Sequence, residues 1–313
     1  MGKFVFYRQK SVIKRIIVVF AVVLAISLCF YLVRFVVDSK FYGRANSFSL
    51  NSSWKNYDYK RVYDLSSEVL YKKKFDYFAL TLHGFSAFYL ALAETDLMLA
   101  QDYLDEAVFN IRNALIYAKK KNIPQLEYML GKIYFYRNLY SSSYYYADLA
   151  VSYLLKSIED GYKSNDVPEF LGLMYADLGM HHESISYFTE ALILRESDNL
   201  LLSIAEQYRK INQNQAAEQY LYRISQNCKD EQIEIKTHLL LGEIYIDQEK
   251  YEKAEGEFDF LIKKEAHLAD AHYNLGVIYE KQGDLVKARS EWRAALKNQS
   301  NHPGALKKMA EYK

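Results

Sequence analysis

The stretch Leu-Gly-Glu-Ile-Tyr at residues 241–245 recurs along the chain, each time with the Leu-Gly pair and a Tyr three residues after the glycine. The other copies are LGKIY at 130–134, LGLMY at 171–175 and LGVIY at 275–279. The leucines of the four copies lie 41, 70 and 34 residues apart. Because 70 is close to twice 34, the spacing predicts a weaker copy midway between Leu171 and Leu241.

Residues 204–208, Ile-Ala-Glu-Gln-Tyr, supply that copy, and His83-Gly84 begins a weaker one upstream. Each copy is followed by small and apolar residues spaced by three and four, which is the spacing of one helix face. These series are Ala107, Ile111, Ala114; Ala150, Leu154, Ser157; Ser184, Phe188, Ala191; Ala217, Leu221, Ile224; Ala254, Phe258, Leu261; and Ala288, Trp292, Ala295. The sequence therefore predicts a helix–turn–helix unit that repeats six times, with a period near 34 residues.

This pattern resembles the tetratricopeptide repeat, in which W-x₂-L-G-x₂-Y is followed by A-x₃-F and then P. Small residues let two antiparallel helices approach to about 8–10 Å, and the aromatic residues fill the space between helices. His238 and His272 stand at the motif's Trp position, where we expect them to pack, stacking on one another. The closing proline is missing. Instead, Pro124, Pro168 and Pro303 fall in the first turn of predicted first helices, where a lost N–H costs nothing.

The resemblance implies an all-α fold: a right-handed α-solenoid of about six helix pairs with a C-terminal capping helix, preceded by one transmembrane helix. It is strongest from residue 165 onward. Val62, Ser66 and Val69 predict a lone second helix before the first complete repeat. The predicted segments are a basic tail at 1–15, a signal anchor at 16–37, a linker at 38–54, divergent repeat-like helices at 55–164, repeats at 165–302 and a capping helix at 303–313.

Residues 16–33 contain no charged residue and would span about 27 Å as a helix, close to the ~30 Å hydrocarbon core of a bilayer. Five basic residues and no acidic residue precede this run. The positive-inside rule therefore predicts a cytoplasmic N-terminus, with the repeats in the periplasm or another extracytoplasmic space. A signal peptide cleaved near residues 43–45 and a lipoprotein signal ending at Cys29 are alternatives. The length of the run and its continuation past Cys29 favour a retained anchor.

The rest of the chain offers little chemistry. Beyond residue 37 there are 34 basic and 39 acidic residues, and this acidic balance argues against nucleic acid as a partner. Phosphate loops, GxSxG elbows, HExxH and CxxC motifs are missing from the sequence. His181-His182-Glu183 lies in a predicted turn without further ligands. We therefore expect no enzymatic activity, no metal and no cofactor.

A partner-binding surface is predicted on the concave face of the solenoid, which each first helix should line with the side opposite its second helix. The predicted residues run from aromatic to charged along the chain. They are Phe85, Phe88, Tyr89, Tyr128, Lys132, Phe135, Tyr136, Phe170, Leu173, Asp177, Glu206, Lys210 and Glu243. The aromatic members could equally pack within the solenoid, and the sequence leaves both interpretations open. The Lys and Asn pairs that clamp a C-terminal carboxylate in some family members are missing.

The resemblance implies a non-catalytic scaffold or adaptor. It would bind and assemble protein or peptide partners on the outer face of the cytoplasmic membrane, as part of a bacterial cell-envelope complex. The alternative is a structural subunit that self-associates as a homo-oligomer into a ring or collar. The collar of the spirochaete periplasmic flagellar motor is such an assembly.

Overall fold

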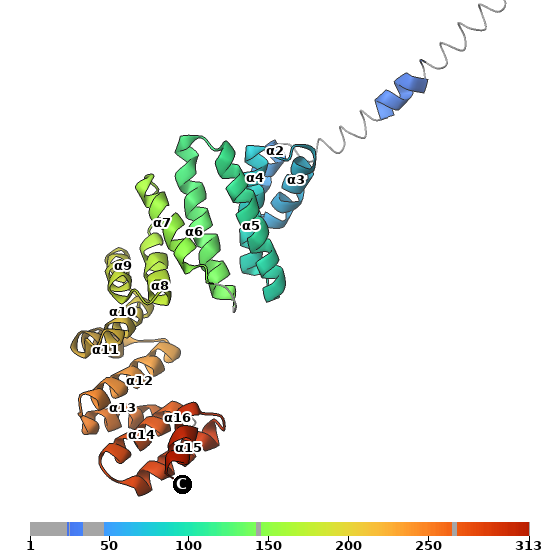
Figure 1. Cartoon of the computed structure of the whole chain (residues 1–313). Helices are drawn as coiled ribbons and strands as arrows, with labels where there is room; N and C mark the ends of the chain where they lie inside the picture. The colour runs from blue at the N-terminus through green and yellow to red at the C-terminus, as the bar shows by residue number, and fades with distance from the viewer. Residues whose placement is uncertain (1–23, 25, 34–46, 142–144, 265–267, 313) are drawn as a thin grey trace, which may run out of the picture. The chain divides into compact units, whose positions relative to one another are not determined.

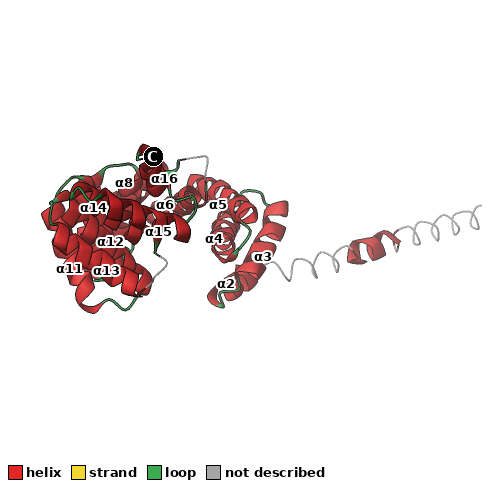
Figure 2. Ribbon diagram, turned by 90° about the horizontal axis from the view of Figure 1, so that it is seen from below, coloured by secondary structure: helices red, strands yellow, loops and turns green. Residues whose placement is uncertain are grey.

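The protein is described by a computed structural model that covers residue 24 and residues 26–33, 47–141, 145–264 and 268–312. All regular structure in these ranges is helical, without a strand (Figure 2). Figure 1 labels the helices. They are α2 (Ser47–Lys55), α3 (Tyr59–Lys72), α4 (Tyr77–Ala93), α5 (Leu97–Tyr117), η1 (Lys120–Asn122), α6 (Ile123–Tyr140), α7 (Ala147–Glu159), α8 (Val167–Asp177), α9 (His181–Leu194), α10 (Asp198–Lys210), α11 (Asn214–Asn227), α12 (Glu231–Asp247), α13 (Tyr251–Lys264), α14 (Ala269–Lys281), α15 (Leu285–Asn298) and α16 (Pro303–Glu311). The predicted all-α class is confirmed for this part of the chain.

The chain divides into two compact units between Tyr140 and Ser141, inside the segment 55–164 that the sequence groups as one domain. The first unit contains α2 to α6, and the second contains α7 to α16. In the second unit α8 packs on α9, α10 on α11, α12 on α13 and α14 on α15. The first helices α10, α12 and α14 also touch in sequence order, so these pairs stack one after another. α16 closes the stack against α15, as predicted for the capping helix.

The small and apolar series of the second helices forms the core of each pair. Ala217, Leu221 and Ile224 of α11 have no exposed surface, and the series in α5, α7, α9, α13 and α15 are buried as well. Each complete burial of a large apolar side chain contributes about 1.5–3 kcal/mol. The period of three and four residues therefore identified the faces that hold these helices in place.

The Leu-Gly pair marks the point where the two helices of a repeat cross. A Cβ atom built on Gly172 would lie 2.5 Å from Cδ1 of Phe188, which is closer than real carbon contacts allow. Gly242 and Gly276 meet the rings of Phe258 and Trp292 in the same way, more closely still. Only a residue without a side chain fits there, because the ring of the second helix occupies the space.

The turn between the helices of a repeat is also periodic. Gly179, Asn212, Glu249 and Gly283 follow the first helices and have φ values of 71°, 58°, 58° and 86°. The next residue then donates its N–H to the carbonyl of the motif tyrosine, as Lys250 does to Tyr245 O over 2.8 Å. This left-handed residue reverses the chain and satisfies a carbonyl that the helix end would leave unpaired.

Three details differ from the sequence prediction. Residues 47–54 do not belong to a linker, because they form most of α2, which packs against α3, so α3 is not a lone second helix. His181-His182-Glu183 opens α9 rather than lying in a turn, since Gly179 already completes the reversal. His238 and His272 do not stack on one another. Each hydrogen-bonds through Nδ1 to a carboxylate of the second helix of its own repeat, which holds its ring toward that helix.

Most of the predicted signal anchor at 16–37 lies outside the described residues. Residue 24 and residues 26–33 are helical, and their side chains are exposed. Within the part of the chain that the structure describes, no helix combines the length and apolar character needed to cross a bilayer.

We predict opposite effects for the same substitution at two helical glycines. Gly276→Ala should lower the free energy of unfolding by about 1–3 kcal/mol, because the new methyl group would overlap Trp292 and the carbonyl of Ala288. Gly256→Ala in α13 meets nothing within 4 Å, so it should raise that free energy by about 0.5–1 kcal/mol. Urea denaturation of both variants measures the two values. Equal effects of the same sign would contradict the assigned helix crossing.

Candidate functional site

The aromatic residues predicted to line the concave face of the first unit are largely buried. Phe85, Phe88, Tyr128 and Phe135 have exposed fractions of 6%, 0%, 8% and 8%. Tyr89, Lys132 and Tyr136 are half-buried. The structure therefore gives the four buried rings a packing role, and a partner-binding role for them stays a prediction.

Helix α2 covers two of the predicted residues, Phe85 and Tyr89. Its Trp54 ring lies 5.9 Å from Phe85 and 6.0 Å from Tyr89, measured between ring centroids. Tyr59 of α3 stacks on Tyr89 at 4.4 Å. Aromatic pairs at these separations contribute about 0.5–1.5 kcal/mol each beyond the area they bury. Helices α2 and α3 thus cover Phe85 and Tyr89, on part of the face that the sequence predicted to bind a partner.

In the second unit the predicted residues remain accessible to differing degrees. Phe170 and Leu173 of α8 are half-buried, whereas Asp177 is exposed. Glu206 and Lys210 of α10 are exposed, and Glu243 of α12 is half-buried. The last three, together with Arg209 and Asp247, form what we call the charged face of α10 and α12.

Ion pairs join the first helices across the charged face. Arg209 reaches Glu243 with an N–O distance of 2.7 Å and Asp247 with one of 3.7 Å. Burial raises the pKa of Glu243, with Asp270 and Asp247 adding to the rise, although Arg209 opposes it. Arg209 is thus the close guanidinium for both Glu243 and Asp247, whereas Asp270 lies 2.9 Å from His302.

Glu206 differs from these carboxylates because it has no ion pair within 4 Å among the described residues. Desolvation by its surroundings raises its pKa, and the more distant ammonium groups of Lys236 and Lys210 only partly offset this. Functional sites in clefts often contain carboxylates with raised pKa values. A cationic group placed beside Glu206 would stabilise its charged form.

Glu206 lines a hollow of about 570 Å³ between α10 and α12. This volume is within the usual range of ligand pockets, about 300–1,000 Å³. The other lining residues are Gln207, Arg209, Lys210, Asn212, Leu240 and Asp247. Two of the residues that the sequence predicted for the site, Glu206 and Lys210, therefore line the same hollow. A third, Glu243, forms an ion pair with Arg209, which also lines it.

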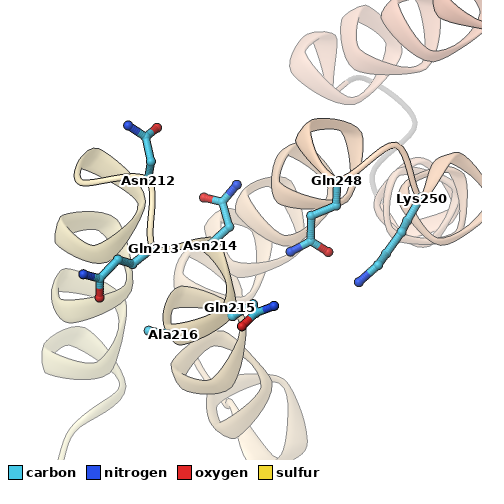
Figure 3. A pocket seen from close by; sticks show the side chains of 7 residues that line it. All are labelled: Asn212, Gln213, Asn214, Gln215, Ala216, Gln248 and Lys250. Carbon is cyan, nitrogen blue, oxygen red and sulfur yellow. The ribbon is translucent and has the colours of Figure 1, made fainter.

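Sequence reasoning missed a second hollow of about 720 Å³ at the repeat turns, shown in Figure 3. Asn212, Gln213, Asn214, Gln215, Ala216, Gln248 and Lys250 line it. The run Asn-Gln-Asn-Gln at 212–215 was a usable signal, because four consecutive carboxamides at a helix–helix turn place many hydrogen-bonding groups on one edge.

One cluster in the first unit has the composition of a catalytic triad. Ser66 Oγ lies 2.9 Å from His83 Nδ1, and His83 Nε2 lies 3.5 Å from Glu106 Oε2. Ser66 is completely buried in the middle of α3, and its hydroxyl also donates to the carbonyl of Tyr63. A substrate cannot reach this oxygen, so Ser66 does not act as a nucleophile. The cluster instead links α3, α4 and α5. Metal sites are similarly unsupported, since no three potential ligands converge in the described part of the chain.

The chain is similar to known repeat proteins. Family models described as tetratricopeptide repeat match residues 170–198 and 239–303. The chain contains tetratricopeptide repeats. The solved C-terminal part of a tetratricopeptide-repeat protein from Cytophaga hutchinsonii aligns with a TM-score of 0.59 and 14% identity, covering 82% of this chain and 97% of that one. That likeness supports the repeat fold.

Two further relatives are more limited. YrrB, described as a TPR protein with an unusual peptide-binding site, aligns with a TM-score of 0.49 at 20% identity, over 64% of this chain and 97% of that one. Regulatory protein RapD of Bacillus subtilis is 44% identical over 71 residues, which is 21% of this chain and 20% of RapD. The chain thus spans about a fifth of the length of this curated relative.

Stability should depend on the protonation of His83. Burial lowers the pKa of His83 more than the nearby Glu106 raises it, so the folded state takes up this proton less readily than the unfolded state. The stability that neutral His83 contributes is fully present above the pKa of about 6.5 that it has in the unfolded chain. It is lost as the pH falls toward the lower pKa of the folded state. As the pH falls from about 7 to about 5, the free energy of unfolding of His83→Gln should therefore decrease less than that of the parent. Denaturation at several pH values measures this.

The exposed His182 supplies the matched control. His182→Gln should preserve the parental pH dependence. A His83→Gln variant with that same dependence would show that the buried imidazole is not the responsible group.

Proposed function

We propose that this protein is a non-catalytic adaptor that binds protein or peptide partners through the charged face of α10 and α12. Glu206 carries the proposal, because this exposed carboxylate has no close ion pair and lines a hollow of ligand size, whose surroundings raise its pKa. Tetratricopeptide repeats provide the setting, since stacked first helices present such surfaces for extended segments. The partner should place a basic side chain beside Glu206 and an acidic or polar group beside Lys210.

We also propose that residues 16–37 anchor the chain in the cytoplasmic membrane, with the repeats on its outer side. The uncharged run of eighteen residues and the basic residues before it support this topology. In this arrangement the adaptor would concentrate its partners at the cell envelope. The ring or collar subunit remains the competing proposal, and it requires the repeats to self-associate.

Removing both charges beside the hollow should weaken partner binding. We expect Glu206→Gln with Lys210→Met to reduce affinity at least tenfold, about 1.4 kcal/mol, because both groups are close to a partly desolvated surface. Crosslinking in native membranes, followed by capture and identification, gives the partner, and titration with the purified partner gives the affinity. Circular dichroism checks that the variant is folded.

The matched control removes one acid and one base from the outer surface of α13. Glu252→Gln with Lys263→Met should bind as the parent does, since both side chains are exposed and lie outside the hollow. A partner that binds all three proteins equally would exclude the charged face. Concentration-dependent self-association without a second protein would instead favour the ring subunit.

The topology can be tested by itself. A reporter active only outside the cytoplasm should work when fused after Lys313, because the charge distribution predicts a cytoplasmic N-terminus and a single crossing. Moving the basic residues from before the apolar run to after it should reduce that activity. Activity of a cytoplasm-only reporter at the same position would overturn the proposed orientation and the envelope role.

A further inference from the structure

The hollow at the repeat turns, which we call the amide hollow, has an unusual chemical composition. Its wall contains the carboxamides of Asn212, Gln213, Asn214, Gln215 and Gln248, together with the ammonium group of Lys250 and the small side chain of Ala216. It contains no carboxylate and no aromatic ring. The site therefore offers many paired hydrogen-bond donors and acceptors and one charged group, the ammonium of Lys250.

The side chains come from two neighbouring repeats. Gln215 projects from the start of α11, whereas Gln248 and Lys250 come from the turn between α12 and α13. In Figure 3 these three side chains extend into the same space between the two repeats. The stacking of the repeats thus creates the hollow, which a single repeat would lack.

Gln248 adds an observation that points to a ligand. Its Oε1 atom is buried and has no hydrogen-bond partner in the structure. A buried acceptor without a donor is unfavourable, so this carboxamide would gain from an N–H group brought into the hollow. Rotation of the amide about its last torsion, which is a soft one, would turn that oxygen toward such a donor.

We propose that the amide hollow binds the main chain of a partner peptide in an extended conformation. A carboxamide carries an N–H and a C=O side by side, so it can exchange two hydrogen bonds with the N–H and C=O of one residue in an extended chain, which point to the same side. Extended chains leave these groups free on both edges, as β-strand addition shows. Carbohydrate is the less suitable ligand, because the wall lacks an aromatic ring on which a sugar could stack.

The inference rests on the proposed function and extends it. Asn212 lines both the amide hollow and the hollow beside Glu206. A peptide held by its side chains at the charged face can therefore continue past Asn212 and be held by its backbone at the turns. The charged face would select the partner sequence, whereas the amide hollow would add affinity that tolerates many sequences.

The test uses a library of random peptides displayed on phage, selected on the full-length protein in detergent. For the selected peptides, Gln215→Met with Gln248→Met should raise Kd about tenfold, because methionine keeps the side-chain length but loses the amide hydrogen bonds. Gln219→Met, in the same helix α11 but outside the hollow, is the matched control and should leave Kd unchanged. N-methylation of the peptide groups in contact should weaken binding to the parent, with a smaller effect on the double variant.

Other outcomes would overturn the inference in distinguishable ways. Peptides that depend on Glu206 or Lys210, but bind the glutamine double variant normally, would exclude the amide hollow and leave the proposed function intact. A glycan array on which binding requires Gln215 and Gln248 would assign the hollow to carbohydrate. A library that yields no peptide sensitive to either set of residues would exclude both proposals.

Discussion

The contact between a glycine of the first helix and an aromatic ring of the second determines how each typical repeat of the second unit is built. Phe188, Phe258 and Trp292 are almost completely buried, and each lies against the glycine of its own repeat. An aromatic ring buries about 150–250 Å² of surface, so its burial stabilises the repeat strongly. Its fit against the glycine also fixes the distance between the two helix axes. That distance sets how closely the two helices of a repeat lie, and the left-handed turn residue then connects them.

The pair α10 and α11 shows that the rule can be relaxed in a compensated way. Ala205 replaces the glycine there, and Leu221 replaces the aromatic ring, and both are completely buried. A larger residue at the crossing is matched by a smaller one opposite, as close packing requires. The left-handed turn residue of this pair is Asn212 rather than glycine, and the polar turn around it forms part of both hollows. The least typical repeat is therefore the one that contributes most to the candidate site.

The repeats could be predicted from sequence because helical periodicity and small residues are local properties. Whether a position on the predicted surface is exposed or buried could not be predicted, since this depends on which neighbouring segment covers it. Phe85 and Glu206 both lie two residues after the start of their motif copies. Phe85 is buried beneath Trp54 of α2, a helix that the sequence assigned largely to a linker, whereas Glu206 remains in a hollow. In the sequence, the histidine–glutamate pairs appear only as a spacing of 19 residues shared by His238–Glu257 and His272–Glu291. That these residues touch follows only once the crossing of the two helices is known.

These histidines also clarify which polar groups are available to a partner. His238 and His272 occupy the motif's Trp position, and each pairs with a carboxylate of its own second helix at 2.6 and 2.7 Å. Polar groups inside the pairs are thus matched to one another, as low-dielectric interiors require. Glu206 has no such ion pair among the described residues, and the carboxamide oxygen of Gln248 is buried without a hydrogen-bond partner. Both lie where adjacent repeats face one another, at the hollows in which we propose that a second chain binds.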